Sequence, residues 1–216
     1  MIEWLKNTPE QPAARLVLAH GAGAPMDSDF MNVMATGLCE RGIDLWRFEF
    51  PYMAERRRTG KKRPPDRQPI LLECWQTAIE EAAGDLPLLI GGKSMGGRMA
   101  SLASQTPGVA GLVCLGYPFH PPGKPEKTRL EPLQNLTVPA LIVQGTRDPL
   151  GGKEEVAEYD LPPSLDWLWL DDGDHDFKPR VKSGHRQSEH WQSALDTVGR
   201  WSLQRIGDLH KLGDNQ

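Results

Sequence analysis

Residues 88–97 read LLIGGKSMGG, and this stretch constrains the fold more than any other. A phosphate-binding loop would need G-x-x-x-x-G-K-[ST], but Pro87 stands where the first glycine belongs and an apolar run follows it. A nucleophile elbow needs a short buried strand, a sharp turn with serine at its apex and a helix that begins at once. We therefore interpret Gly92-Lys93-Ser94-Met95-Gly96 as a nucleophile elbow with Ser94 at its apex.

The two glycines of this pentapeptide flank Ser94 where strand and helix approach so closely that a side chain would collide with the backbone. The apolar residues that follow recur at helical spacing: Met95, Met99, Leu102 and Ala103. The pentapeptide also occurs by chance, and the alternative is a glycine-rich turn whose serine only caps the helix. The interpretation therefore needs support from the rest of the chain.

Apolar runs alternate with helical patterns along the 216 residues. The expected strands are 15–19, 44–50, 88–91, 111–115, 140–144 and 165–170, and the expected helices are 29–40, 70–83, 94–104, 153–159 and 189–206. This alternation predicts an α/β fold, a three-layer α/β/α sandwich around a mostly parallel sheet of six or seven strands. The length suits a single domain over residues 1–216, with the polar tail 207–216 expected to be frayed.

A serine nucleophile needs a base and an acid that orients the base. In this fold the acid should precede the base along the chain, each just beyond a strand. Asp148 lies in the turn after strand 140–144, and His175 lies in the turn after strand 165–170. Other acids flank His175 on its own turn, at Asp171, Asp172, Asp174 and Asp176. The order and placement predict Ser94, Asp148 and His175 as the catalytic residues.

Each candidate has a plainer alternative. Asp148 precedes a proline and could simply start a turn, and His175 could face solvent. The acidic residues around His175 imitate the start of a calcium loop, but Phe177 stands where such a loop needs glycine and Ser183 where it needs glutamate. The sequence therefore predicts no metal site and no cofactor.

An oxyanion hole in this fold takes one N–H from the residue after the nucleophile and one from the loop after an early strand. Met95 would supply the first. The second would come from Ala22, because strand 15–19 runs directly into His20-Gly-Ala-Gly23, a loop that we expect His20 to brace. The alternative is a glycine turn without function.

Taken together, the motifs HGAG at 20–23, GKSMG at 92–96, GTRDPLG at 145–151 and GDHDF at 173–177 resemble the α/β-hydrolase superfamily across nearly the whole chain. More narrowly, the chain resembles the small, nearly capless branch related to dienelactone hydrolases. Segments 50–67 and 116–127 resemble a subgroup that includes a vertebrate testis-expressed protein and a subunit of a chromatin acetyltransferase complex. The resemblance implies the same triad, and the short segment before Arg15 implies a sheet trimmed at that edge.

These motifs predict acyl transfer to water, with a carboxylic ester as the substrate class and thioester, lactone or peptide left open. A Pro-rich loop stands between Tyr117 and Leu136, where larger relatives insert a lid, so we expect an open site. The rival hypothesis is an interaction protein that retains the hydrolase fold, and a serine peptidase or acyltransferase is a further alternative.

Residues 56–67 form a basic run at the sheet end where the catalytic loops gather. It is either a solvated loop or a collar that attracts anionic acyl substrates or an acidic partner. Nucleic acid is disfavoured because the net charge is −4 and no aromatics interleave with the charges. The candidate substrate-binding residues are His20, Lys93, Tyr117, His120, Arg57 and Arg58.

The sequence shows neither a signal peptide nor an apolar stretch long enough to cross a bilayer. Cys39, Cys74 and Cys114 are odd in number and widely spaced, which is typical of reduced, packed thiols. These features predict a cytoplasmic protein with a small-molecule acyl substrate and no membrane attachment. They do not identify a protein partner.

Overall fold

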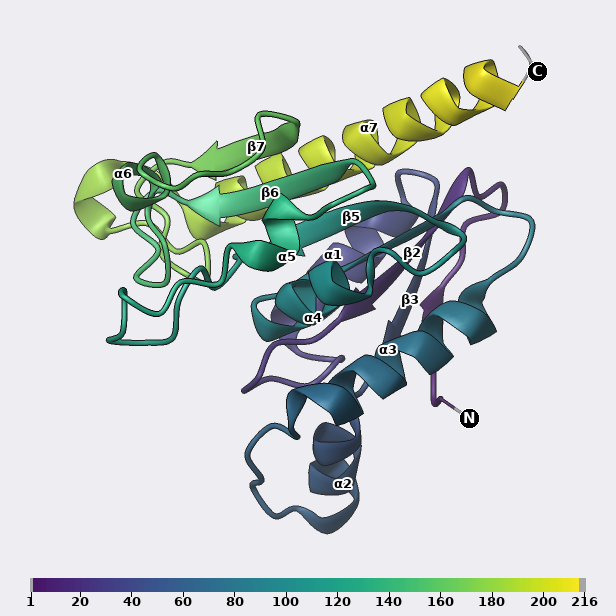
Figure 1. Ribbon diagram of the computed structural model, residues 1–216, viewed down its shortest axis with the longest axis horizontal. Helices are drawn as coiled ribbons and strands as arrows, with labels where there is room; N and C mark the ends of the chain where they lie inside the picture. The colour runs from purple at the N-terminus through teal and green to yellow at the C-terminus, as the bar shows by residue number, and fades with distance from the viewer. Residues whose placement is uncertain (1, 214–216) are drawn as a thin grey trace.

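The computed structural model of the chain describes residues 2–213 and centres on one seven-stranded sheet (Figure 1). The strands are β1 (Leu5–Asn7), β2 (Ala14–Ala19), β3 (Ile43–Phe48), β4 (Leu88–Lys93), β5 (Val109–Leu115), β6 (Ala140–Gly145) and β7 (Leu165–Leu170). Their spatial order is β1-β3-β2-β4-β5-β6-β7. β1 pairs antiparallel with β3 and the other pairings are parallel. The mostly parallel sheet predicted from the sequence is confirmed.

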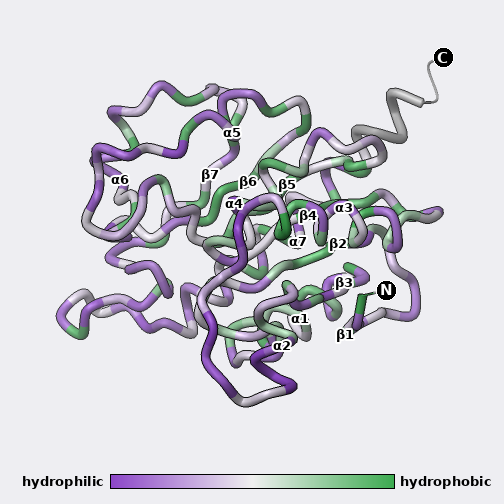
Figure 2. Tube along the Cα trace, turned by 60° about the horizontal axis from the view of Figure 1, so that its bottom comes forward, coloured by the Kyte–Doolittle hydropathy of each residue, from purple (hydrophilic) through white to green (hydrophobic). Residues whose placement is uncertain are grey.

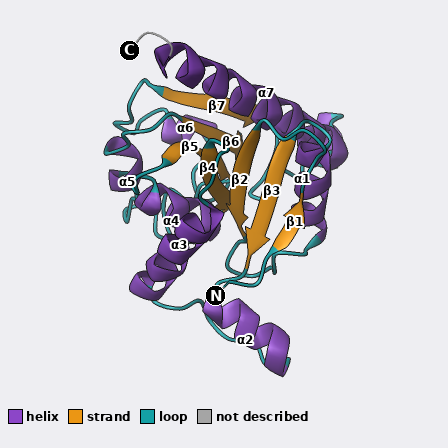
Figure 3. Cartoon of the chain, turned by 90° about the vertical axis from the view of Figure 1, so that its right-hand side faces the viewer, coloured by secondary structure: helices purple, strands orange, loops and turns teal. Residues whose placement is uncertain are grey.

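Helices cover both faces of the sheet (Figure 3). They are α1 (Asp29–Cys39), α2 (Pro51–Thr59), α3 (Gln68–Ala82), α4 (Met95–Ala103), α5 (Glu131–Gln134), α6 (Lys153–Val156) and α7 (Gln187–Gly213), with a 3₁₀ turn at Val181–Ser183. Side chains alternate along β2: Leu16 packs into the core under α1 and α7, and Val17 packs into the core under α3 and α4. The result is the expected three-layer sandwich.

The sequence did not predict three of the elements. β1 has only three residues, which agrees with a sheet trimmed at this edge. α2 carries no apolar stripe; it starts at Pro51, and the residue that follows its last turn is Gly60, where φ is 70°. α5 is a four-residue turn of helix. Residues 207–213, expected to be part of a frayed tail, continue helix α7, and residues 214–216 of that tail lie outside the described residues.

No cap domain covers the carboxyl ends of the strands in the described chain. Between β5 and β6 the chain forms the loop that the sequence predicted, interrupted by the short α5. α2 projects from the body beyond α3 (Figures 1 and 3), and the loop after it is largely hydrophilic (Figure 2). Within residues 2–213, none of the helices combines the length and apolar character needed to span a membrane.

The turn between β4 and α4 has the strained geometry that a nucleophile elbow requires. Ser94 has φ 52° and ψ −117°, a backbone conformation that residues other than glycine rarely adopt. A Cβ atom on Gly96 would lie 2.5 Å from Ala19 O and 2.6 Å from His20 O. A Cβ atom on Gly92 would lie 2.7 Å from Ala19 O. Glycine at these two positions therefore lets α4 start directly against β2.

Replacing Gly96 by alanine should destabilise the protein by on the order of 2 kcal/mol or more, because the added methyl meets two backbone oxygens that cannot move independently of the sheet. Gly23→Ala is the matched control, since no atom lies within 4 Å of its Cβ position. Chemical denaturation of both variants checks this expectation. Equal stability of the two variants would contradict the close approach of α4 and β2.

Candidate active site

Three polar side chains meet at the carboxyl ends of β4, β6 and β7. His175 Nε2 lies 2.8 Å from Ser94 Oγ, and His175 Nδ1 lies 2.7 Å from Asp148 Oδ2. Ser94 sits at the turn into α4, Asp148 follows β6 and His175 follows β7. The parallel sheet thus brings together the three residues that the sequence singled out, although they are far apart in the chain.

Asp148 is buried in a network of donors. The Leu150 N–H donates to Oδ1 at 2.8 Å, and the side chain of Gln144 donates from Nε2 to Oδ2 at 3.0 Å. Gln144 is itself fully buried and accepts a hydrogen bond from the Tyr117 N–H at 2.7 Å. From the sequence, Gln144 was expected only as the last residue of strand 140–144. An amide at the end of the otherwise apolar β6 was the signal that could have identified it.

The other acids near His175 hold the shape of its loop. Asp172 pairs with Arg180 and Arg147, and these guanidinium groups, Arg180 foremost, hold the pKa of Asp172 well below its usual range. Asp174 accepts hydrogen bonds from two backbone N–H groups of the same loop. Asp171 lies beside His185. Within the described residues, the His175 ring hydrogen-bonds only to Ser94 and Asp148, so the acid that contacts it is the one in the turn after β6.

Lys93, immediately before Ser94, ties the histidine loop to β4. Its buried Nζ donates to the backbone oxygen of His175 at 2.7 Å and lies 3.7 Å from Asp176 Oδ1. Burial lowers the pKa of Lys93, and the nearby carboxylates oppose that shift. Lys93 therefore helps to fix the position of His175 through the backbone carbonyl group of His175.

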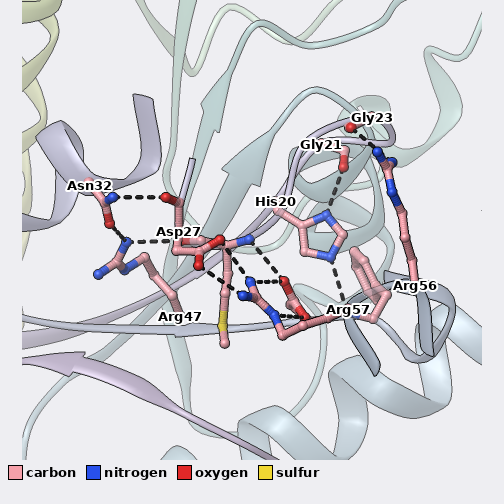
Figure 4. Close-up of polar contacts among 11 residues, drawn as sticks. His20, Gly21, Gly23, Asp27, Asn32, Arg47, Arg56 and Arg57 are labelled. Atoms are coloured by element: carbon pink, nitrogen blue, oxygen red, sulfur yellow. Dashed lines mark hydrogen bonds and ion pairs between the residues drawn. The ribbon is translucent and has the colours of Figure 1, made fainter. Parts of the chain in front are cut away.

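His20 braces the loop that contains Ala22 (Figure 4). Its Nδ1 donates to Gly21 O at 2.7 Å and its Nε2 accepts the Phe50 N–H at 3.1 Å, a pattern that requires a neutral ring. Burial lowers the pKa of His20, which favours this neutral form. Tyr52 also donates its hydroxyl to Ala22 O at 3.0 Å. Hydrogen bonds from Phe50 and Tyr52, at the start of α2, thus hold the loop after β2 in place.

Ser94 lies between two cavities. The larger, about 620 Å³, is lined by Gly21, Ala22, Phe30, Lys93, Ser94, His175 and Trp191, among others. The smaller, about 370 Å³, includes Ala22, Ser94 and Met95 in its lining. The backbone N–H groups of Ala22 and Met95 donate to no acceptor within the described residues. Both therefore remain available beside Ser94.

Five of the six candidate substrate-binding residues line neither cavity. Tyr117 is fully buried and donates its hydroxyl to Arg129 O, and His120 is buried against Glu155. Arg57 pairs with Asp27 and Glu49, and Arg58 pairs with Glu55. Local carboxylates thus neutralise these two arginines, so the structure does not support an electrostatic collar of Arg57 and Arg58 around Ser94. His20 is likewise absent from the cavity linings, whereas Lys93 lines the larger one.

Comparison with known proteins identifies the family of the chain. Residues 12–203 match a protein family described as "Alpha/beta hydrolase domain". The chain belongs to this alpha/beta hydrolase family. Membership of this family supports a hydrolase enzyme. The narrower resemblance to the testis-expressed and acetyltransferase-complex subgroup stays a prediction.

Solved structures of similar fold include a dienelactone hydrolase from Anabaena variabilis, with a TM-score of 0.70 and 18% identity over 93% of this chain and 90% of that one. Est1E from Butyrivibrio proteoclasticus has a TM-score of 0.71 and 15% identity over 95% of each chain. A serine hydrolase without lid from Xanthomonas campestris has a TM-score of 0.68 and 16% identity over 93% of this chain and 89% of that one. At these identities the likeness establishes the fold.

The neutral ring of His20 predicts a pH-dependent stability. Its pKa is lowered in the folded protein, so its contribution is complete above its ordinary value of 6.5 and is lost as the pH falls below that value. Between pH 7.5 and pH 5.5, the wild type should lose up to about 1 kcal/mol more unfolding free energy than His20→Gln. Urea denaturation at both pH values measures this difference. Identical losses in the two proteins would contradict the neutral brace.

Proposed function

We propose that the protein is a serine hydrolase that cleaves a carboxylic ester through an acyl-enzyme intermediate. The observation that carries the proposal is the chain of hydrogen bonds from Asp148 through His175 to Ser94, at 2.7 and 2.8 Å. A serine hydroxyl is a weak nucleophile until a base accepts its proton. The His175 ring lies within hydrogen-bond distance of the Ser94 hydroxyl and can serve as that base.

In the proposed mechanism, His175 Nε2 takes the Ser94 proton as Oγ bonds to the ester carbonyl carbon. The ester C–O bond then breaks, and His175 returns the proton to the departing alcohol. Water repeats the attack on the acyl-enzyme, and its proton passes through His175 back to Ser94 as the acid leaves. Asp148 keeps the proton of the neutral ring on Nδ1 and stabilises the positive charge that develops on His175.

The oxyanion of each tetrahedral intermediate would accept hydrogen bonds from the backbone N–H groups of Ala22 and Met95. This assignment is supported by the position of both residues beside Ser94 and by the absence of acceptors for these N–H groups within the described residues. His20 and Gln144 are positioning residues in this scheme: His20 holds the Ala22 loop, and Gln144 holds the Asp148 carboxylate.

A carboxylic ester is the substrate class that we propose first, with thioester, lactone or peptide as alternatives for the same machinery. Among the structural neighbours, Est1E has been solved with ferulic acid bound, and another neighbour is a dienelactone hydrolase. The two cavities beside Ser94 are of a size that small-molecule substrates fill. We further propose a cytoplasmic location, because all three cysteines are unpaired thiols.

Ser94→Ala should lower the turnover of 4-nitrophenyl butyrate by about a thousandfold or more, because the covalent route is lost. Ser193→Ala, an exposed serine on α7, is the matched control and should retain wild-type turnover. Release of 4-nitrophenol measures both. Undiminished turnover by Ser94→Ala would overturn the assignment of the nucleophile. A wild type without activity on esters, thioesters or lactones would favour the interaction-protein hypothesis.

A further inference from the structure

Two arginines line the smaller cavity beside Ser94. Arg98 lies one turn after Ser94 on α4, and Arg129 lies in the loop between β5 and β6. Both are half-buried, and both line the cavity of about 370 Å³ that also includes Ala22, Ser94 and Met95. The same two residues also line a second cavity, of about 590 Å³. Positive charge is thus built into the wall next to the nucleophile.

Within the described residues, neither of these two guanidinium groups is paired with a carboxylate. Arg98 donates from Nη2 to Gln68 Oε1 at 3.0 Å, but its buried Nε has no hydrogen-bond partner within the described residues. The Arg129 guanidinium makes neither a hydrogen bond nor an ion pair in the described part of the chain. Burial, and next the charge of Arg98, lower the pKa of Arg129.

Several other arginines of the chain are paired with carboxylates. The described ion pairs with Asp or Glu include those of Arg15, Arg41, Arg57, Arg58, Arg147 and Arg180. Asp66 lines the smaller cavity, but its Oδ2 accepts the Tyr52 N–H at 2.8 Å and forms no ion pair with Arg98 or Arg129 in the described residues. Two like charges held together near a cavity, with donors unused, provide a binding site for an anion.

The position of His175 indicates whether the smaller cavity holds the acyl portion or the alcohol portion of the substrate. The departing alcohol must take its proton from His175, which lines the larger cavity and is absent from the lining of the smaller one. The alcohol portion therefore faces the larger cavity, and the acyl portion extends into the smaller. Leu71, Met95 and Met99 give that cavity an apolar wall suited to a short methylene chain.

We propose that Arg98 and Arg129 bind a terminal carboxylate on the acyl portion, so that half-esters of short dicarboxylic acids are the substrate class. This inference rests on the proposed function and adds the specificity of its acyl site. A carboxylate matches the planar donor arrangement of a guanidinium group and would give the unpaired donors of both arginines an acceptor.

The test compares 4-nitrophenyl hydrogen adipate with 4-nitrophenyl hexanoate, two esters of equal chain length that differ in the terminal carboxylate. Wild-type kcat/KM should be higher for the adipate half-ester. Arg129→Gln should lower kcat/KM for this half-ester on the order of tenfold or more, mainly through KM, and leave the hexanoate within about twofold. Arg129→Lys keeps the charge and should retain part of the preference.

Arg200→Gln removes one positive charge from the exposed surface of α7 and is the matched control. Equal losses on both esters, no loss on the half-ester, or the same selective loss in Arg200→Gln would overturn the carboxylate site. If the wild type cleaves the hexanoate but not the half-ester, the proposed function stands and this inference fails. If it cleaves neither ester, both fail. Thermal unfolding of each variant separates a binding defect from a folding defect.

Discussion

The close contact between the start of α4 and the end of β2 is the constraint on which the site depends. A single methyl group on Gly96 would meet the backbone oxygens of Ala19 and His20, so the helix can start here only where no side chain stands. That contact holds Ser94 at φ 52°, at the uncapped carboxyl ends of the strands. It also places the first N–H of α4 beside the loop that carries Ala22.

Asp148 and His175 lie near Ser94 because β4, β6 and β7 are parallel, so their carboxyl ends lie on the same side of the sheet. The turn after β6 carries Asp148, and the turn after β7 carries His175. Polar contacts then fix each turn: Gln144 holds the carboxylate and Lys93 holds the histidine backbone. Asp172 of the histidine loop pairs with Arg180 of the same loop and with Arg147 of the turn after β6. A sheet of mostly apolar residues therefore supports a small set of polar groups, and hydrogen bonds and ion pairs from neighbouring residues fix their positions.

Sequence patterns predicted the elements whose cause is local. The elbow, the order of acid and base and the six main strands follow from glycine spacing and apolar runs. α2 was missed because its charged residues carry no apolar stripe. Two features depend on residues that only the fold brings together, so no local pattern shows them. They are the carboxylates that neutralise Arg57 and the shared cavity that Arg98 and Arg129 line. Gln144 acts through a carboxylate in the following turn, which becomes visible only in three dimensions.

A fluorophosphonate probe with peptide mapping tests the central claim most directly, because it reports an activated serine without any choice of substrate. The account predicts one phosphonylated serine, Ser94, in the folded protein, and loss of that label on unfolding in urea. A label on another serine, or a folded protein that does not react, would contradict the claim that the turn after β4 holds an activated nucleophile.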